Sequence, residues 1–77
     1  MTSAQLRAAR ALLDWSQTTL SEKSGLSVET IKRLERMKGS LEATKVSTLE
    51  AITKAFDKGG VEFTNGDAPG VRMQAKR

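Results

Sequence analysis

The sequence contains neither cysteine nor histidine among its 77 residues. Without cysteine the chain forms no disulfide, and it has no thiolate to hold the zinc ion of a zinc finger. Without histidine it lacks the commonest general base and metal ligand, so no Ser-His or Cys-His catalytic pair can be assembled. These absences predict a protein that is not an enzyme and that uses neither a metal ion nor a cofactor.

Several kinds of segment are missing as well. A single proline and 29% charged residues argue against a proline-rich linker or a long disordered tail. No apolar run approaches the roughly 20 residues of a membrane-spanning helix. Residues 1–10 also lack the apolar core of a secretion signal. We therefore expect a cytoplasmic protein that does not contact a membrane, with room for one small domain.

The chain does have an excess of positive charge, with 13 Lys and Arg residues against 9 Asp and Glu and a net charge of +4. A basic surplus on a small domain indicates an anionic partner such as nucleic acid, although many other domains carry a similar charge. Hydrophobic residues make up 38% and aromatic residues 4%, which suits a compact helical core of leucine, alanine and isoleucine.

Helical periodicity and helix-start signals predict four helices before residue 60. The predicted N-caps are Thr2 with Gln5 as a capping box, Ser16, Ser27, and Ser47 with Glu50 as a second capping box. Gly25 stands where the second helix needs a left-handed C-cap. The second and third predicted helices, 17–24 and 28–37, are therefore joined by about three residues, which is typical of a helix-turn-helix.

After Gly60 the apolar period changes from helical to alternating, which predicts a β-hairpin. In such a hairpin one face carries the apolar side chains Val61, Phe63, Val71 and Met73, and the other carries Glu62 and Arg72. The turn would lie within residues 64–70. We expect a helix-turn-helix domain over residues 1–60, with its motif at about 17–36. Residues 61–77 would add a hairpin and a frayed basic tail to the same domain.

Residues 17–36 satisfy, in combination, the spacing requirements of a DNA-binding helix-turn-helix. Ser21 is small where two helices cross, Gly25 makes the turn, and Ile31 and Leu34 are placed to hold the second helix on the first. At these positions the sequence resembles the phage repressor and Cro type of helix-turn-helix regulator, the lambda-repressor-like family, over roughly residues 4–58. The most specific matches are Ser16-Gln17, residues 21–25, Thr30-Ile31 and Leu34-Glu35. The sequence departs from the pattern at Ser21, where Ala is usual, and at Met37, where Gly is common.

The resemblance implies a mainly α fold, a four-helix DNA-binding domain that is followed here by a short hairpin. It also implies a nucleoid-associated bacterial or phage regulator of transcription that binds double-stranded DNA through a recognition helix at 28–37. The base-reading positions carried over from the family are Val28, Glu29, Lys32 and Arg33. Arginine can bond guanine bidentately, glutamate can accept from cytosine N4, and valine can pack on a thymine methyl.

The resemblance assigns roles outside the recognition helix too. Gln17 is the predicted phosphate anchor, because it stands at a helix N-terminus whose free amides favour an anion. Further phosphate contacts are predicted for Arg36, Lys38 and Lys45. Arg10 and Glu35 are expected to form an ion pair that ties the first helix to the third. Trp15 is expected to pack at the edge of the core.

Two functions remain open at this stage. A regulator of this size is expected to act as a homodimer, because one motif reads only a few base pairs. The expected dimer contacts lie on the fourth helix or the hairpin. Alternatively, the same fold serves as a protein-binding module, an anti-activator or antitoxin-like domain that caps another regulator or a toxin. Charge distinguishes the two: if Arg10 neutralises Glu35, residues 27–38 are more basic than their four cations and two carboxylates indicate.

Overall fold

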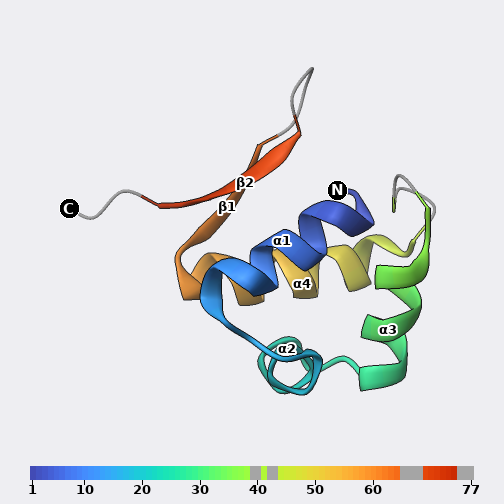
Figure 1. The fold of residues 1–77 in the computed structure, drawn as a ribbon. Coiled ribbons are helices and arrows are strands. Elements are labelled where there is room, and N and C mark those ends of the chain that lie inside the picture. Colours follow the sequence, from blue (N-terminus) through green and yellow to red (C-terminus); the bar gives the residue numbers. More distant parts are fainter. Residues whose placement is uncertain (39–40, 42–43, 65–68, 75–77) are drawn as a thin grey trace.

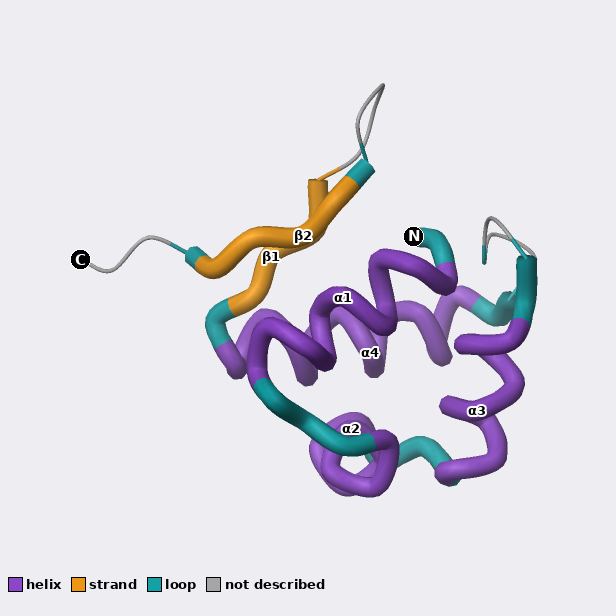
Figure 2. Tube along the Cα trace, viewed as in Figure 1, coloured by secondary structure: helices purple, strands orange, loops and turns teal. Residues whose placement is uncertain are grey.

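The computed structural model describes residues 1–38, 41, 44–64 and 69–74 (Figure 1). Its elements are α1 (Ser3–Leu13), α2 (Gln17–Ser24), α3 (Val28–Arg36), α4 (Val46–Gly59), β1 (Val61–Thr64) and β2 (Gly70–Met73). The helices pack around one core, and the two strands form an antiparallel hairpin beside α1 and α4 (Figure 2). This arrangement confirms the predicted fold class.

Three of the four predicted helix starts are confirmed. The hydroxyl oxygens of Thr2, Ser16 and Ser27 each accept a hydrogen bond from the backbone N–H three residues later, at 3.0–3.1 Å. Each bond satisfies a helix N–H that has no partner within its own helix. Gly25 ends α2 with φ of +75°, as the predicted left-handed C-cap requires.

Two helix ends differ from the prediction. α4 begins at Val46, and its N-cap Lys45 makes no side-chain cap, so the capping box predicted at Ser47 is wrong. Ser47 already lies inside the helix, because the Lys45 carbonyl accepts the N–H of Leu49 at 3.1 Å. α3 ends at Arg36, one residue earlier than predicted. Met37 follows it with an extended backbone at φ −65°, which is why this end needs no glycine.

The core draws residues from every helix and from β1. Its buried members are Leu6, Ala9, Leu20, Ile31, Leu34, Leu41, Ile52, Ala55, Phe56 and Val61. Leu41 is an unexpected member, since it lies in a segment that the sequence identifies only as a polar loop, and its N–H donates to the Met1 carbonyl at 2.9 Å. Trp15 stacks on Phe56 at 5.4 Å between ring centroids and is half-buried, which confirms its expected place at the core edge.

The hairpin has its apolar and charged residues on the predicted faces, and the structure adds the register. Its pairs are Val61 with Met73, Glu62 with Arg72, Phe63 with Val71 and Thr64 with Gly70. Val61 is buried and Phe63 packs edge-on against Phe56 at 5.7 Å, so this apolar face mainly completes the domain's own core. Met73 is the member that stays well exposed, at 48%. Residues 65–68 of the turn predicted within 64–70, and residues 75–77 of the predicted tail, lie outside the described residues.

One side chain fastens the Thr64–Gly70 end of the hairpin to α1. The Gln5 Nε2 amide donates to the Thr64 carbonyl at 2.8 Å and to the Gly70 carbonyl at 3.0 Å, so it bridges the two strands. Its Oε1 accepts the backbone N–H of Thr2 at 2.8 Å, which completes the capping box of α1. Gln5 is only 4% exposed. The same residue therefore starts the first helix and positions the hairpin.

Replacing Gln5 by leucine is expected to destabilise the protein by about 1–3 kcal/mol, because partly buried backbone groups lose their hydrogen-bond partner. Amide hydrogen exchange should show β1 and β2 opening before the helices. Gln74→Leu is the matched control, since the Gln74 side chain is exposed and bonds only Asp57 among the described residues. If the hairpin amides of Gln5→Leu stay as protected from exchange as in the wild type, Gln5 does not hold the hairpin on α1.

Candidate nucleic-acid interface

Helices α2 and α3 form a tight helix-turn-helix. Residues 25–27 connect them, and the buried side chains of Leu20, Ile31 and Leu34 lie in the core on which both helices pack. The Ser21 hydroxyl donates to the Leu26 carbonyl in the turn. Serine at this small position therefore ties α2 to the connection, a bond that alanine cannot make.

α3 presents a polar face to solvent. Glu29, Lys32, Arg33 and Arg36 are exposed, whereas Ile31 and Leu34 on the opposite side are fully buried. Val28, at the start of the helix, is half-buried. All four predicted base-reading residues thus lie on the first two turns of α3, with three of their side chains exposed.

Glu35 is the centre of a network that joins α1, α2 and α3. Arg10 contacts both of its carboxylate oxygens, with Nε to Oε2 at 2.6 Å and Nη2 to Oε1 at 2.7 Å. Gln17 Nε2 donates to the same Oε1 at 3.1 Å. Burial alone would raise the pKa of the Glu35 carboxyl, but the hydrogen bonds from Arg10 and Gln17 and the charges of Arg10 and Arg7 outweigh it, so this pKa is lowered.

The network changes the charge of the exposed face. Glu35 is 7% exposed and paired with Arg10, so it contributes little negative charge to the surface. Residues 27–38 then have four exposed cationic side chains and one exposed carboxylate, that of Glu29. The cations are Lys32, Arg33, Arg36 and Lys38. The surface at α3 is more basic than its sequence alone indicates.

Gln17 is half-buried, and the network holds its side chain in place. Its amide nitrogen carries two hydrogens, and Glu35 accepts one of them. Among the described residues nothing accepts the other hydrogen, so it can bond an anion together with the Gln17 backbone N–H, which at the first position of α2 has no intrahelical partner. An anchor for phosphate at this place would be rigid and uncharged.

The predicted phosphate residues lie in three places rather than in one patch. Arg33 and Lys45 line a groove of about 440 Å³ between α3 and the start of α4. Arg36 and Lys38 line another groove, of about 500 Å³, between the end of α3 and the start of α1. Gln17 lines neither groove.

Arg7 is a residue of this surface that the sequence analysis gave no role. It lines the groove with Arg36 and Lys38, and its Nη1 donates to the Glu35 backbone carbonyl. A signal was present in the sequence, because Arg7 precedes Arg10 by three residues and the two therefore share a helix face. Arg10 was expected to reach the third helix. Arg7 could therefore have been expected to lie on the side of α1 that faces α3.

The fold and this surface define a small DNA-binding domain of the helix-turn-helix type. A family model described as helix-turn-helix matches residues 6–63, well over half of the chain. The chain therefore belongs to the lambda-repressor-like helix-turn-helix family, and its activity is DNA binding in the regulation of transcription. The match supports this family and not the narrower phage Cro type.

No protein of curated function matches the sequence. Within the described part of the chain, no three acidic side chains gather closely enough to hold a metal ion. None of the helices in that part is both long and apolar enough to cross a membrane.

Proposed function

We propose that the protein is a sequence-specific regulator of transcription that inserts α3 into the major groove of DNA. The observation that carries this proposal is the pairing of Glu35 with Arg10, which leaves the exposed face of α3 with three cations and one carboxylate, and Lys38 adds a fourth cation just after the helix. α3 is a helix of nine residues. An α-helix with its side chains is about 10–12 Å in diameter, so it fits the major groove, which is about 12 Å wide.

The side chains of α3 supply the chemistry for reading bases. Arg33 is fully available for a bidentate contact with guanine, because it is exposed and has no carboxylate partner among the described residues. Glu29 accepts from cytosine N4, Val28 packs on a thymine methyl, and Lys32 borders them. Gln17, Arg36, Lys38 and Lys45 then hold the phosphates on the flanks of the groove.

A selection from a random duplex library identifies the preferred site, and alanine variants then separate the two kinds of contact. Arg33→Ala is expected to weaken binding to the selected duplex by about 1–3 kcal/mol and to narrow its preference over a scrambled duplex. Lys38→Ala should weaken both duplexes alike and flatten the salt slope by about 0.9, because one phosphate loses its counter-charge. Fluorescence anisotropy at several salt concentrations measures both effects.

Gln17→Ala is expected to weaken both duplexes by a similar factor without changing the salt slope, since glutamine releases no counterion. Unlike Arg33 and Lys38, Gln17 bonds a buried carboxylate, so its variant should also melt at a lower temperature. Titrations must therefore be made well below the melting temperature of each variant. Equal effects of Arg33→Ala on both duplexes would contradict base reading by Arg33.

We infer that two copies bind two half-sites as a homodimer, with contacts on α4 and the hairpin. A groove of about 350 Å³ between them supports this surface, since Met1, Leu49 and Phe63 line it. Leu49→Asp should shift the protein from dimer to monomer in sedimentation at about 100 μM, because burying an unpaired carboxylate in an interface is costly. A wild-type protein that stays monomeric with and without DNA would contradict the dimer.

The protein-binding function is the other possible outcome of these experiments. If the library yields no preferred duplex, and a protein partner competes for the face at residues 28–38, the anti-activator or antitoxin-like function replaces the proposal. The fold is compatible with both functions.

A further inference from the structure

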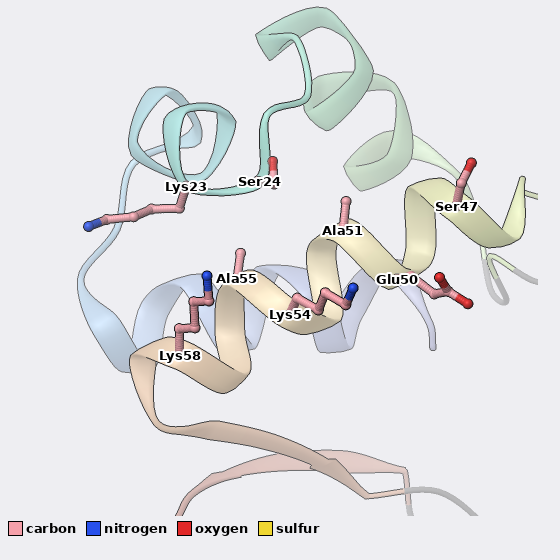
Figure 3. Close-up of a pocket in the computed structure, with 8 residues that line it drawn as sticks. All are labelled: Lys23, Ser24, Ser47, Glu50, Ala51, Lys54, Ala55 and Lys58. Carbon is pink, nitrogen blue, oxygen red and sulfur yellow. The ribbon is translucent and has the colours of Figure 1, made fainter.

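A second basic surface lies away from α3, in a groove between α2 and α4 (Figure 3). Its volume is about 330 Å³, and its lining residues are Lys23, Ser24, Ser47, Glu50, Ala51, Lys54, Ala55 and Lys58. All of them belong to α2 or α4. An occupant of this groove, here named the lysine groove, would leave the exposed face of α3 free.

The three lysines of the groove form no ion pair with any residue that the structure describes. The ion pairs within the described residues join Arg10 to Glu35 and Arg72 to Glu62. Glu50 lies at one end of the groove, but its carboxylate is not within ion-pair distance of Lys54. Asp57 accepts a hydrogen bond from Gln74 on the hairpin side. Lys54 and Lys58 are therefore like charges one helical turn apart, an arrangement that weakens the helix unless an anion lies between them.

The groove is elongated and ends on an aromatic ring. A smaller hollow of about 170 Å³ continues it, lined by Trp15, Gly59 and the shared residues Lys23, Ala55 and Lys58. The Lys23 ammonium lies 5.9 Å from the centre of the Trp15 ring. From Ser47 to Gly59 the two hollows follow α4 for about 18 Å. The apolar residues that line the larger hollow are Ala51 and Ala55.

These dimensions fit an extended chain. Alternate residues of an extended peptide lie about 6.7 Å apart, and their side chains point the same way. Lys54 and Lys58 are separated by about 6 Å along α4, so they match two acidic side chains at positions i and i+2. The Trp15 end offers an apolar surface to a neighbouring residue. About five or six extended residues cover the length of the groove.

We propose that the lysine groove docks an extended acidic peptide segment of a partner protein, with alternating carboxylates on Lys54 and Lys58 and an apolar residue against Trp15. Lys23 lines the groove from the α2 side. Since the groove and the exposed face of α3 lie on different surfaces, the domain can hold this peptide and DNA at the same time.

The test uses an octapeptide in which aspartate alternates with serine and one end carries leucine, with a control peptide that has asparagine in place of aspartate. Trp15 is the only tryptophan of the chain, so its fluorescence reports binding at its end of the groove. The acidic peptide should change this fluorescence, and ¹⁵N chemical shifts should move at Lys54, Ala55 and Lys58. The asparagine peptide should do neither.

Two double variants separate the two basic surfaces. Lys54→Gln/Lys58→Gln should weaken peptide binding roughly five- to thirtyfold, since two exposed ion pairs are lost, and should leave binding of a mixed-sequence 24-bp duplex and its salt slope unchanged. Lys32→Gln/Lys45→Gln, the matched control, should have the opposite effects. The lysines in both variants are exposed, so melting temperatures should stay close to that of the wild type.

Three results would overturn the proposal. Equal peptide affinity in both double variants would show attraction to net charge alone. A lower DNA affinity with a flatter salt slope in Lys54→Gln/Lys58→Gln would make the groove a phosphate contact. A change of sedimentation in the same variant would make it an interface between copies of this chain. None of these results bears on base reading by α3, which the Arg33 variant tests separately.

Discussion

Arg10→Met is expected to lower the free energy of unfolding by about 3–5 kcal/mol, because it leaves the carboxylate of Glu35 buried without its cation. A domain of 77 residues has a total stability of about 4–12 kcal/mol, so the loss is a large fraction of it. Both carboxylate oxygens of Glu35 accept hydrogen bonds from Arg10, and Gln17 alone cannot replace them. Urea unfolding followed by circular dichroism at pH 7 measures the effect.

The second ion pair of the described chain provides the matched control. Arg72 pairs with Glu62 on the hairpin, but their side chains are 70% and 38% exposed. Arg72→Met should therefore cost less than about 1 kcal/mol. Arg10→Met/Glu35→Leu should be more stable than Arg10→Met, because it removes the stranded charge as well. If Arg10→Met and Arg72→Met lower the free energy of unfolding equally, the buried ion pair stabilises the protein no more than the exposed one.

The same pair predicts how stability depends on pH. In the folded state the pKa of Glu35 is lowered, so the unfolded chain takes up a proton at this carboxyl at a higher pH than the folded chain. The stabilisation is complete above the unfolded value of roughly 4.3 and is lost as the pH falls through the folded value. The difference in unfolding free energy between the wild type and Glu35→Gln should therefore shrink below that pH. A constant difference down to pH 2.5 would contradict the lowered pKa.

Phe56→Ala is expected to cost about 3–5 kcal/mol, since it removes a fully buried ring and leaves a cavity. Phe56 contacts Trp15 on one side and Phe63 on the other, so it joins the α1–α2 connection, α4 and the hairpin. Trp15 should also become more accessible to quenching by acrylamide. Leu12→Ala is the control, because Leu12 is 46% exposed and should change stability by less than about 0.5 kcal/mol. A similar cost for the two variants would contradict the central place of Phe56.

Features that depend on neighbours in the sequence were predictable. The caps at Thr2, Ser16 and Ser27 each act on an N–H three residues away, and the two faces of the hairpin follow from its alternating residues. Ser47 and Glu50 match the pattern of a capping box, but both lie inside α4. A pattern of two residues does not determine where the backbone becomes helical.

Features that depend on distant contacts were not predictable. Leu41 is buried although it lies in a polar segment, and its backbone N–H bonds to the carbonyl of Met1, 40 residues away. Gln5 resembles an ordinary capping residue, and its bonds to the hairpin become visible only in three dimensions. In the site, the exposure of the α3 side chains follows helical periodicity. The bond of Gln17 to Glu35 and the place of Arg7 depend on how three helices meet. Which bases and phosphates these side chains contact stays a prediction.

The hydrogen bonds of Gln5 to the hairpin affect the order in which the domain folds during synthesis. Its two acceptors lie 59 and 65 residues after it in the chain, so closing this contact requires almost the whole domain to have left the ribosome. Helices α2 and α3 are neighbours in the chain and contact each other, so we expect them to form sooner. Until β2 emerges, the amide of Gln5 must bond to water. We therefore expect a nascent chain to form its helices, including the capping box of α1, before the hairpin docks on Gln5.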